Sequence, residues 1–358
     1  MNKMHKIAEV GAPTVAVIVP FYNGAKWIER AIKSVINQTT PPDEFFIVND
    51  GSTPQEREAL AALAKDYPFT IIDKKNGGQG SARNAGVRAA TSEFISFLDQ
   101  DDFYFPDHIR DLVEALPERD CRLGFVYANL CGADEDGNIF HSNLLDDIPS
   151  RNPKRGRITS LLRNDLYILP SASLIKKSAF EKIDGFDEQF TGYEDDDLFL
   201  RMFRAGFTNY YLDKSVTVWC QHTGSTSYSI KMARSRWKYF MKLSETFLDA
   251  PHHHGFSFRD CLLPRFAPLF MMDAYKAVLS QSADREELVN MLVDFSKVVS
   301  ANASVGRPYK VRLRLFAWAL QHPYRPVMFT LRSMFTIRYR VLGPVARLLG
   351  LRRKHRTA

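Results

Sequence analysis

Three carboxylates, Asp99, Asp101 and Asp102, directly follow the apolar stretch Phe94 to Leu98 in the segment FISFLDQDD. Carboxylates this close repel one another unless a cation lies among them, and their oxygens are ligands that Mg²⁺ and Mn²⁺ prefer. An Asp-x-Asp at the end of a buried strand therefore indicates a divalent ion that holds a diphosphate. A single Asp-x-Asp also occurs in solvated acidic turns, so this interpretation depends on the motifs around it.

A second group of acids opens the segment GYEDDDLFLRMFRAGF, where Glu194, Asp195, Asp196 and Asp197 stand together. The helix dipole alone favours acids in a first helical turn, which is the structural explanation. The functional explanation is that one of them is a general base in a cleft, its pKa tuned by burial and by the neighbouring acids.

A nucleotide base needs an aromatic face and an acceptor for its N–H group. Tyr22 and Asp50 each follow a predicted strand and would supply the face and the acceptor. The alternative is that Tyr22 packs in a loop and Asp50 caps the next helix.

The segment NGGQGSARN, residues 76–84, is a glycine-rich loop that runs into a helix. Backbone N–H groups in such a loop approach a phosphate or a sugar closely, and Arg83 adds a fixed positive charge. The glycine spacing gives neither the GxGxxG of dinucleotide-binding folds nor a P-loop, so a plain flexible turn is the alternative.

The elements that must position these residues alternate regularly. Strands at 14–19, 45–48, 69–72 and 94–98 are separated by helices at 24–37, 54–65 and about 80–90. This alternation predicts βαβ units and a mostly parallel sheet. Right-handed crossovers bring the strand ends, with Tyr22, Asn23, Asp50, Asp99 and Asp101, to one edge, where α/β sheets bind their ligands.

The second half of the sequence is less regular. We expect a mobile loop over residues 141–165, which are polar and charged. The further predicted elements are helices at 106–116 and 195–205, strands at 123–130, 171–175, 210–212 and 216–219, and helices at 230–248, 267–280 and 284–300.

Composition limits the class of protein. The chain has 358 residues, 45% of them hydrophobic and 25% charged, as in globular proteins. Its four cysteines are far apart without CxxC spacing, which favours reduced thiols in a cytoplasmic protein. Residues 1–12 have no apolar run of signal-peptide length, and no stretch of about 18 uncharged apolar residues predicts a transmembrane helix.

The net charge of +7 comes from the C-terminal segment. Residues 306–358 hold 13 of the 48 Lys and Arg and none of the 41 acids. From residue 328 the segment also mixes apolar side chains with the basic ones, which is typical of a peptide on an anionic membrane surface. A helix packed on the preceding helices with an exposed basic face is the alternative. No aromatic platform or groove-reading motif accompanies the charge, so we expect no nucleic acid partner.

Five segments, in order and spacing, closely resemble the family 2 glycosyltransferases with the GT-A fold: VIVPFYN, FFIVNDGST, NGGQGSARNAG, FISFLDQDD and KIDGFDEQFTGYEDDDLFLRMFRAGF. The resemblance implies an α/β fold with a mixed, mostly parallel sheet flanked by helices, here with a C-terminal helical region. It also implies inverting sugar transfer from a nucleotide-diphosphate donor, UDP-sugar in particular, to an acceptor hydroxyl with Mg²⁺ or Mn²⁺.

The resemblance assigns roles residue by residue. Pro20, Tyr22 and Asn23 belong to the nucleotide pocket, Asp50 to the base, Arg83 to the diphosphate, and Asp99 to the ribose or the outer sphere of the metal. Asp101 is the direct metal ligand, with His222 as a further candidate. Asp195 is the catalytic base and Glu194 the substitute for it. Gly185, Phe186 and Asp187 border the acceptor site.

Two positions depart from the family pattern. The family commonly has two acids before the Gly-Ser turn, and here the first is Asn49. Residues 233–237 keep the Arg-Trp of the QxxRW motif of processive members without its Gln, and the membrane helices are missing. We therefore expect a non-processive enzyme that adds one sugar, with Trp237 in the core of a helix.

The predicted organisation is an N-terminal extension at 1–13, a glycosyltransferase domain at 14–225, a helical region at 226–305 and a basic amphipathic tail at 306–358. The predicted function is synthesis of a bacterial-type surface polysaccharide or glycolipid, with a glycan or lipid-linked acceptor. We expect it in the cytoplasm, peripheral on the inner face of the plasma membrane. A metal-dependent nucleotidyltransferase and a catalytically silent glycan- or lipid-binding scaffold are the alternatives.

Overall fold

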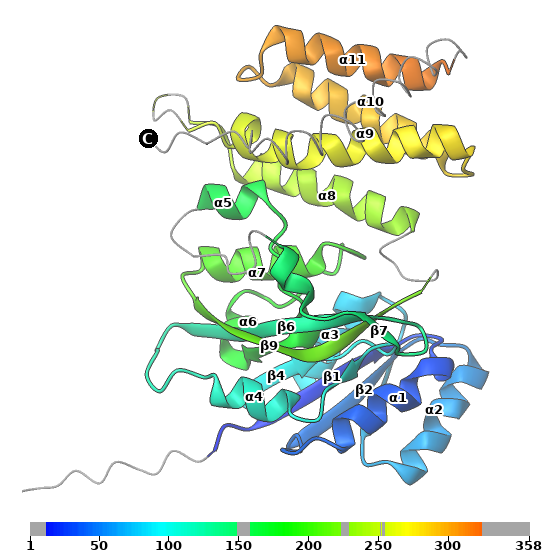
Figure 1. Cartoon of the computed structure of the whole chain (residues 1–358), viewed down its shortest axis with the longest axis vertical. Helices are drawn as coiled ribbons and strands as arrows, with labels where there is room; N and C mark the ends of the chain where they lie inside the picture. The colour runs from blue at the N-terminus through cyan, green and yellow to red at the C-terminus, as the bar shows by residue number, and fades with distance from the viewer. Residues whose placement is uncertain (1–11, 149–157, 223–228, 251, 253–254, 324–358) are drawn as a thin grey trace, which may run out of the picture. The chain divides into compact units, whose positions relative to one another are not determined.

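The computed structural model describes residues 12–148, 158–222, 229–250, 252 and 255–323 (Figure 1). The chain divides into two compact units, Met1–Thr246 and Phe247–Ala358. The predicted boundary after residue 225 differs from this division, which assigns twenty-one more residues to the first unit.

Four parallel strands form one half of a sheet in the first unit, in the order β3-β2-β1-β4. Right-handed crossovers place α1 and α2 on one face and α3 on the other, because the chain reverses direction along the sheet after β3 (Figure 1). The elements are β1 (Val15–Phe21), α1 (Ala25–Ile36), β2 (Glu44–Asp50), α2 (Pro54–Asp66), β3 (Thr70–Lys74), α3 (Gln79–Ala89) and β4 (Phe94–Phe97).

Packing explains why this half follows the sequence pattern so closely. All seven residues of β1 are buried, as expected of a strand covered on both faces. α3 lies very close to β1 and β2, since a Cβ on Gly86 would overlap Ile18 and contact Val48. The absence of a side chain at this position thus lets α3 approach the sheet.

The other half of the sheet is mixed. β8 (Ser173–Lys176) runs antiparallel between β4 and β6 (Leu123–Asp134), and β9 (Thr208–Gln221) runs parallel to β6. β5 (Phe103–Tyr104) and β7 (Ile139–His141) pair antiparallel with β9 and β6. Six of the nine strands in the described residues therefore run in one direction, which confirms the mixed, mostly parallel sheet. The two strands predicted at 210–212 and 216–219 are one strand, β9.

The expectation of a loop over 141–165 was wrong for its described part. A 3-10 turn, η1 (Leu144–Asp147), and a helix, α5 (Ile158–Arg163), form there, while residues 149–157 lie outside the described residues. Leu145, Leu161 and Leu162 are buried. These few leucines determine the structure of a segment that is otherwise polar.

The remaining helices of the first unit surround the mixed half. They are α4 (His108–Glu114), α6 (Lys177–Lys182), α7 (Glu194–Arg204) and α8 (Ile230–Thr246), with a short turn η2 (Pro170–Ala172) before β8. Trp237, expected in the core, is half-buried in α8.

The second unit is helical. It contains a π-helical turn, η5 (Phe258–Leu262), and the helices α9 (Leu263–Ser280), α10 (Arg285–Ala301) and α11 (Arg307–Gln321). Phe266, Phe270 and Phe295 form its aromatic centre. α11 lies in the segment predicted as a tail; the rest of that segment, from residue 324, is outside the described residues. Within the described residues no helix is both long and apolar enough to cross a membrane.

Candidate active site

Parallel strands bring the predicted donor-binding residues to one edge of the sheet. Tyr22 and Asn23 follow β1, Asp50 ends β2, and the acid motif from Asp99 follows β4. The start of α3, with Gln79 and the glycine-rich loop before it, adjoins the same edge, as the following hydrogen bonds show.

Asp50 anchors the glycine-rich loop. Its Oδ1 accepts hydrogen bonds from the Gly77 N–H at 2.9 Å and from the Lys74 ammonium at 2.6 Å, and its Oδ2 accepts one from the Gly78 N–H at 2.7 Å. The alternative role as a cap of α2 does not hold, because the Thr53 side chain caps that helix. Recognition of a base by Asp50 stays a prediction, for which Oδ2 has a further acceptor position.

Tyr22 and the acid motif are joined through Gln100, which stands between Asp99 and Asp101. The Tyr22 N–H donates to Gln100 Oε1 at 2.9 Å, and Gln100 Nε2 donates to the Tyr22 carbonyl at 3.3 Å. A Cβ on Gly24 would overlap this Gln100 amide. The Tyr22 side chain is 49% exposed, so its ring is accessible to a planar ligand.

Asn23 connects the loops after β1 and β2. Its backbone is left-handed, with φ of 48°, and its N–H donates to Ser52 Oγ at 3.0 Å. Its side-chain oxygen accepts from the Thr53 N–H, also at 3.0 Å. Pro20 is buried within β1, where it pairs with Val48 of β2, so it supports the edge from inside the sheet.

The departure from the family pattern at Asn49 has a local explanation. Asn49 Nδ2 donates to Asp73 Oδ1 at 2.8 Å, and Asp73 is also held by Arg57 at 2.6 Å and 2.8 Å. Asn49 Oδ1 accepts from the Ser52 N–H. An acid at position 49 would place a second carboxylate against Asp73, which an amide avoids.

The first acid of the motif, Asp99, is held from α3. Its Oδ1 accepts hydrogen bonds from Gln79 Nε2 at 2.7 Å and from Arg83 Nη2 at 2.5 Å. These contacts fix the carboxylate at the sheet edge.

The second acid, Asp101, contacts the predicted histidine. Asp101 Oδ2 and His222 Nε2 are 2.8 Å apart, and the imidazole stacks on Trp27. Burial, and then repulsion from Asp99, raise the pKa of Asp101.

The third acid, Asp102, is fully buried and accepts the Cys220 N–H at 2.8 Å. Burial and the two neighbouring acids raise the pKa of Asp102 well above the usual range. This repulsion among carboxylates is what a bound cation would relieve.

No group of three metal-ligating side chains is assembled within the described residues. The donor set nevertheless fits a hard divalent ion, because Asp101 and His222 already lie together and Asp99 raises the pKa of Asp101. Magnesium sites often use one or two carboxylates and complete their coordination with substrate phosphates. Asp99 Oδ1 is occupied by Gln79 and Arg83, which leaves Asp101 as the more direct ligand.

Arg83 bridges the two acid motifs. Besides Asp99, its guanidinium contacts Glu194 Oε1 at 3.5 Å and lies over the rings of Phe97 and Phe186. The side chain is only 3% exposed. This placement differs from the predicted one facing a diphosphate, because the charge is enclosed between two carboxylates and two rings. The Asp-x-Asp motif and the start of α7 are thereby shown to be neighbours.

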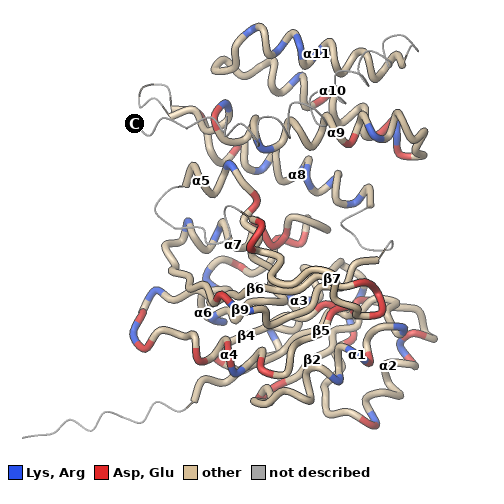
Figure 2. The backbone as a smooth tube through the Cα atoms, in the orientation of Figure 1, with Lys and Arg blue, Asp and Glu red and all other residues tan. Residues whose placement is uncertain are grey.

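Four acids follow one another at the start of α7, where Figure 2 shows a continuous acidic stretch of backbone. The chain enters the helix through Tyr193, whose φ of 64° is left-handed. Burial raises the pKa of Glu194, although Arg83 opposes the rise, and Glu194 Oε2 is buried without a hydrogen bond to any residue that the structure describes. Burial, and then repulsion from Glu194, raise the pKa of Asp195 to about 7. A carboxyl with this pKa exchanges protons near neutral pH, as a general base must.

The next two acids of α7 have structural partners. Asp196 accepts the Leu166 N–H at 2.7 Å. Asp197 pairs with Arg201 at 2.7 Å and with Lys242 of α8 at 2.5 Å. They are therefore poor candidates for a proton-accepting role.

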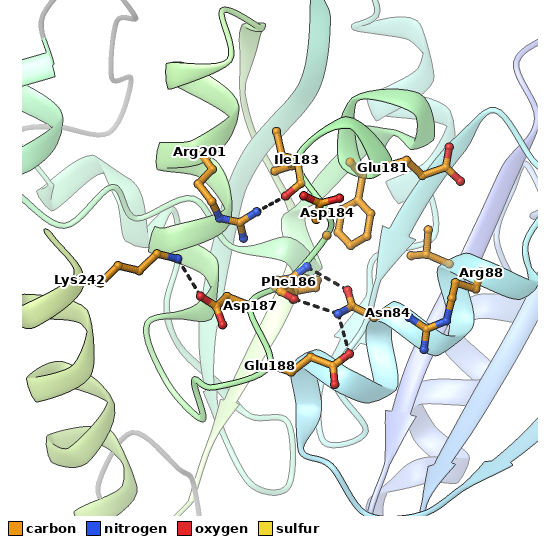
Figure 3. A pocket seen from close by; sticks show the side chains of 13 residues that line it. Asn84, Arg88, Glu181, Ile183, Asp184, Phe186, Asp187, Glu188, Arg201 and Lys242 are labelled. Atoms are coloured by element: carbon orange, nitrogen blue, oxygen red, sulfur yellow. Dashed lines mark hydrogen bonds and ion pairs between the residues drawn. The ribbon is translucent and has the colours of Figure 1, made fainter. Parts of the chain in front are cut away.

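The predicted acceptor-side residues Gly185, Phe186 and Asp187 line a cavity of about 620 Å³ between α3, the loop before α7, and α8 (Figure 3). Asp187 pairs with Lys242 at 2.8 Å, and Asn84 donates to the Phe186 carbonyl and to Glu188. Neither acid motif belongs to the described lining of this cavity. An acceptor role for these three residues stays a prediction.

Sequence reasoning missed the role of α8, which was expected in a separate helical region. Its side chains hold the loop that leads into α7: Ser235 Oγ accepts the Thr191 N–H at 2.9 Å, Arg236 donates to the Tyr193 hydroxyl at 3.1 Å, and Lys238 donates to the Gln189 carbonyl. The Arg of the incomplete QxxRW motif was the available signal, since it is the residue that contacts Tyr193.

Two models of known protein families match segments of the first unit. The model "Glycosyl transferase family 2" matches residues 16–184, and the model "N-terminal domain of galactosyltransferase" matches residues 169–223. An uncharacterized glycosyltransferase of Rickettsia typhi is 31% identical over 235 residues, which cover 64% of this chain and 72% of the relative. The chain belongs to glycosyltransferase family 2.

The chain spans about a third or less of the length of other curated relatives that it matches. Chondroitin synthase of Escherichia coli is 30% identical over 195 residues, or 54% of this chain and 27% of the synthase. The match spans only 29% to 36% of the length of three further uncharacterized glycosyltransferases, from Rickettsia bellii, Rickettsia felis and Rickettsia conorii.

Solved structures share the GT-A fold with this family 2 chain. S. aureus TarS 1–349 in complex with UDP-GlcNAc has a TM-score of 0.59 at 19% identity, over 89% of this chain and 92% of TarS. The mannosyltransferase PcManGT from Pyrobaculum calidifontis, in complex with GDP-Man and Mn²⁺, has a TM-score of 0.53 at 21% identity, over 95% and 88%. The glycosyltransferase fold predicted from the motifs is confirmed.

Proposed function

We propose that the protein transfers a single sugar, with inversion, from a UDP-sugar to an acceptor hydroxyl, in the synthesis of a surface polysaccharide or glycolipid. The observation that carries the proposal is the Arg83 bridge, which brings Asp99 and Glu194 to the same guanidinium at 2.5 Å and 3.5 Å. Residues separated by almost a hundred positions thus share one site. Sugar transfer needs the two acid motifs close together, because the diphosphate leaves the same anomeric carbon that the deprotonated acceptor hydroxyl attacks.

Binding would start from the nucleotide. The exposed ring of Tyr22 offers a face to the base, and Asp50 offers an acceptor for the base N–H. Asp101 and His222 would hold Mg²⁺ or Mn²⁺ against the diphosphate, with Asp99 beside them. When bound, the ion neutralises the diphosphate and makes it a better leaving group.

In the chemical step Asp195 would accept the proton of the acceptor hydroxyl. The hydroxyl oxygen then forms its bond to the anomeric carbon on the face opposite the diphosphate, and the bond to the diphosphate oxygen breaks, so the configuration inverts. The pKa of Asp195, about 7, lets this carboxylate take a proton during the reaction at neutral pH and release it afterwards. Glu194, held by Arg83, would keep the pKa of Asp195 raised through repulsion between the two carboxylates.

The choice of donor, ion and acceptor in this proposal is supported by similar proteins. TarS and PcManGT are described with nucleotide-sugars, and PcManGT with Mn²⁺, which supports a nucleotide-sugar donor and a divalent ion. A relative named chondroitin synthase supports a glycan acceptor. We also infer that the acceptor is lipid-linked and that the enzyme works in the cytoplasm at the inner face of the plasma membrane, attached through the basic segment 306–358, whose part from residue 324 lies outside the described residues.

A panel of UDP- and GDP-sugars, each with and without Mn²⁺, tests the proposal. We expect one donor to raise the melting temperature in a Mn²⁺-dependent way, by linkage of binding to folding, and to release its nucleoside diphosphate slowly in water. Asp101→Ala should abolish the Mn²⁺-dependent shift, and Asp136→Ala, in an exposed hairpin turn, should keep it. If no donor in the panel shifts the melting temperature or is hydrolysed, the proposal is wrong.

A further inference from the structure

Helix α11 presents apolar side chains on both its sides. Leu313, Phe316, Ala317 and Leu320 are buried in the second unit, where α11 packs on α9 and α10. Val311, Leu315 and Trp318, however, are 53%, 60% and 55% exposed. An ordinary amphipathic surface helix would carry polar residues at these three positions.

The three exposed side chains form one stripe. They are spaced at i, i+4 and i+7, so at 3.6 residues per turn they fall within an arc of about 60° on the helix surface, opposite the buried face. Single exposed apolar residues are common on proteins, but three large ones in a line, one of them tryptophan, need an explanation.

Positive charge flanks the stripe. Arg307 and Arg314 lie on one side of it and Arg312 on the other, and Lys310 lies further round the helix. Residues 301–323 contain four basic residues and no acid (Figure 2). An apolar stripe that includes a tryptophan, bordered by arginines and free of acids, matches an anionic lipid surface: the stripe enters the acyl boundary while the guanidinium groups meet the headgroups.

We propose that α11 lies flat on an anionic membrane, with Val311, Leu315 and Trp318 inserted between the lipids. The proposal deepens the membrane attachment included in the proposed function, because it assigns the contact to a folded helix of the second unit. A protein partner is less suitable, since the arginines on both sides of so narrow a stripe would each need an acidic counterpart, whereas an anionic bilayer supplies negative charge all round. The substitutions that test it lie outside the residues assigned to sugar transfer.

The test is flotation of the full-length chain with two kinds of vesicle, phosphatidylcholine alone and phosphatidylcholine mixed with phosphatidylglycerol. We expect wild type to float with the mixed vesicles only. The triple variant Val311→Ser, Leu315→Ser, Trp318→Ser should bind them at least about tenfold more weakly. Because these positions are exposed, the variant should keep its fold, which circular dichroism checks.

Matched controls separate the stripe from general hydrophobicity. Leu248→Ser and Leu279→Ser replace exposed leucines of the same unit, 73% and 46% exposed, and should leave binding unchanged. The double variant Arg307→Gln, Arg312→Gln should weaken binding by roughly fivefold per charge, with the loss reduced at high salt. Trp318 emission should shift to shorter wavelength on addition of mixed vesicles, and Trp318→Phe should remove that shift.

Three results would overturn the proposal. The first is unchanged vesicle binding in the triple variant, which would assign attachment to another segment, residues 324–358 included. The second is equal binding to both vesicle types. The third is a wild-type dimer in light scattering that the triple variant converts to monomer without any vesicle binding, which would make the stripe a contact between copies. Donor hydrolysis is measured in parallel without vesicles, so loss of the proposed sugar transfer is distinguished from loss of membrane binding.

Discussion

The donor edge, made by the ends of β1, β2 and β4, and the start of α7 position acids in different ways. At the donor edge the acid is neutralised by backbone and by nearby cations: Asp50 accepts two glycine N–H groups and the Lys74 ammonium. At α7 the buried Glu194 contacts a single arginine and the next residue, Asp195, is half-buried, and loss of solvent around them raises the pKa of both. Asp50 is thus held in place by donors on both of its oxygens, whereas Glu194 and Asp195, like Asp101 beside His222, are carboxyls that burial makes harder to ionise.

The two regions also differ in where their supports come from. Strand register and short loops within the first hundred residues position Tyr22, Asn23 and Asp50 at the donor edge, while Cys220 and His222, at the end of β9, hold only Asp102 and Asp101. The start of α7 is held by α3, through Arg83, and by α8, through Ser235 and Arg236. The proposed base-binding residues are therefore fixed by local βα units, whereas the proposed catalytic base depends on distant helices.

The largest effect is expected on turnover in Asp195→Asn. Removing a general base costs about 10² to 10⁴ in rate, while donor binding at the other region should persist. Initial rates and donor-dependent thermal shifts measure the two effects separately. Near wild-type turnover in this variant, together with a loss in Glu194→Gln, would transfer the role to Glu194.

Arg83→Met should sever the link between the two regions. Removing one partner of a buried ion pair leaves uncompensated carboxylates on Asp99 and Glu194, at a cost of about 3 to 5 kcal/mol of unfolding free energy. Urea denaturation measures this loss, with Arg88→Met, at an exposed position of the same helix, as the control. Adding Glu194→Gln should restore part of the stability; if it restores none, Asp99 alone depends on Arg83.

The pH dependence of turnover should come from α7. Asp195 must be ionised to accept a proton, and its pKa is about 7, so the rate should fall about tenfold per pH unit as the pH decreases below that value. A pH–rate profile with a midpoint near 4 would show that burial does not act on the base as described.

A smaller effect is expected when α8 is loosened. Lys242→Met removes the ammonium that contacts Asp187 and Asp197, at a cost of about 1 to 2 kcal/mol, because Arg201 still neutralises Asp197. Turnover should fall several-fold with unchanged donor affinity. Lys231→Met, at an exposed position of the same helix, is the control. Loss of donor affinity in place of turnover would contradict the division between the two regions.

The donor edge was predictable from the sequence because its residues follow directly on buried strands. The apolar run before Asp99 predicts both the strand and the edge at which it ends. The details were less predictable: Arg83 was expected to face a ligand, but the guanidinium is enclosed by the rings of Phe97 and Phe186, the second of which lies a hundred residues away. Local spacing does not report such contacts.

The rest of the site depends on tertiary packing. The segment 141–165 read as a loop because it is polar, yet a few buried leucines give it two helical turns. α8 read as part of another domain because it follows a change in composition, while its polar side chains bond to the loop before α7. The exposed stripe of α11 was not predicted, because the sequence shows only a segment of mixed basic and apolar residues. The structure is needed to tell which apolar residues are buried and which are exposed.

Gln100 has a consequence for sugar selectivity. By bonding to both the N–H and the carbonyl of Tyr22, it ties the proposed platform for the base to the acids on either side of it in the sequence. In the proposed mechanism, this side-chain amide fixes the distance between the site for the base and the site for the diphosphate, whichever sugar the donor carries. The proposed mechanism therefore assigns the choice of sugar to parts of the site other than the donor edge.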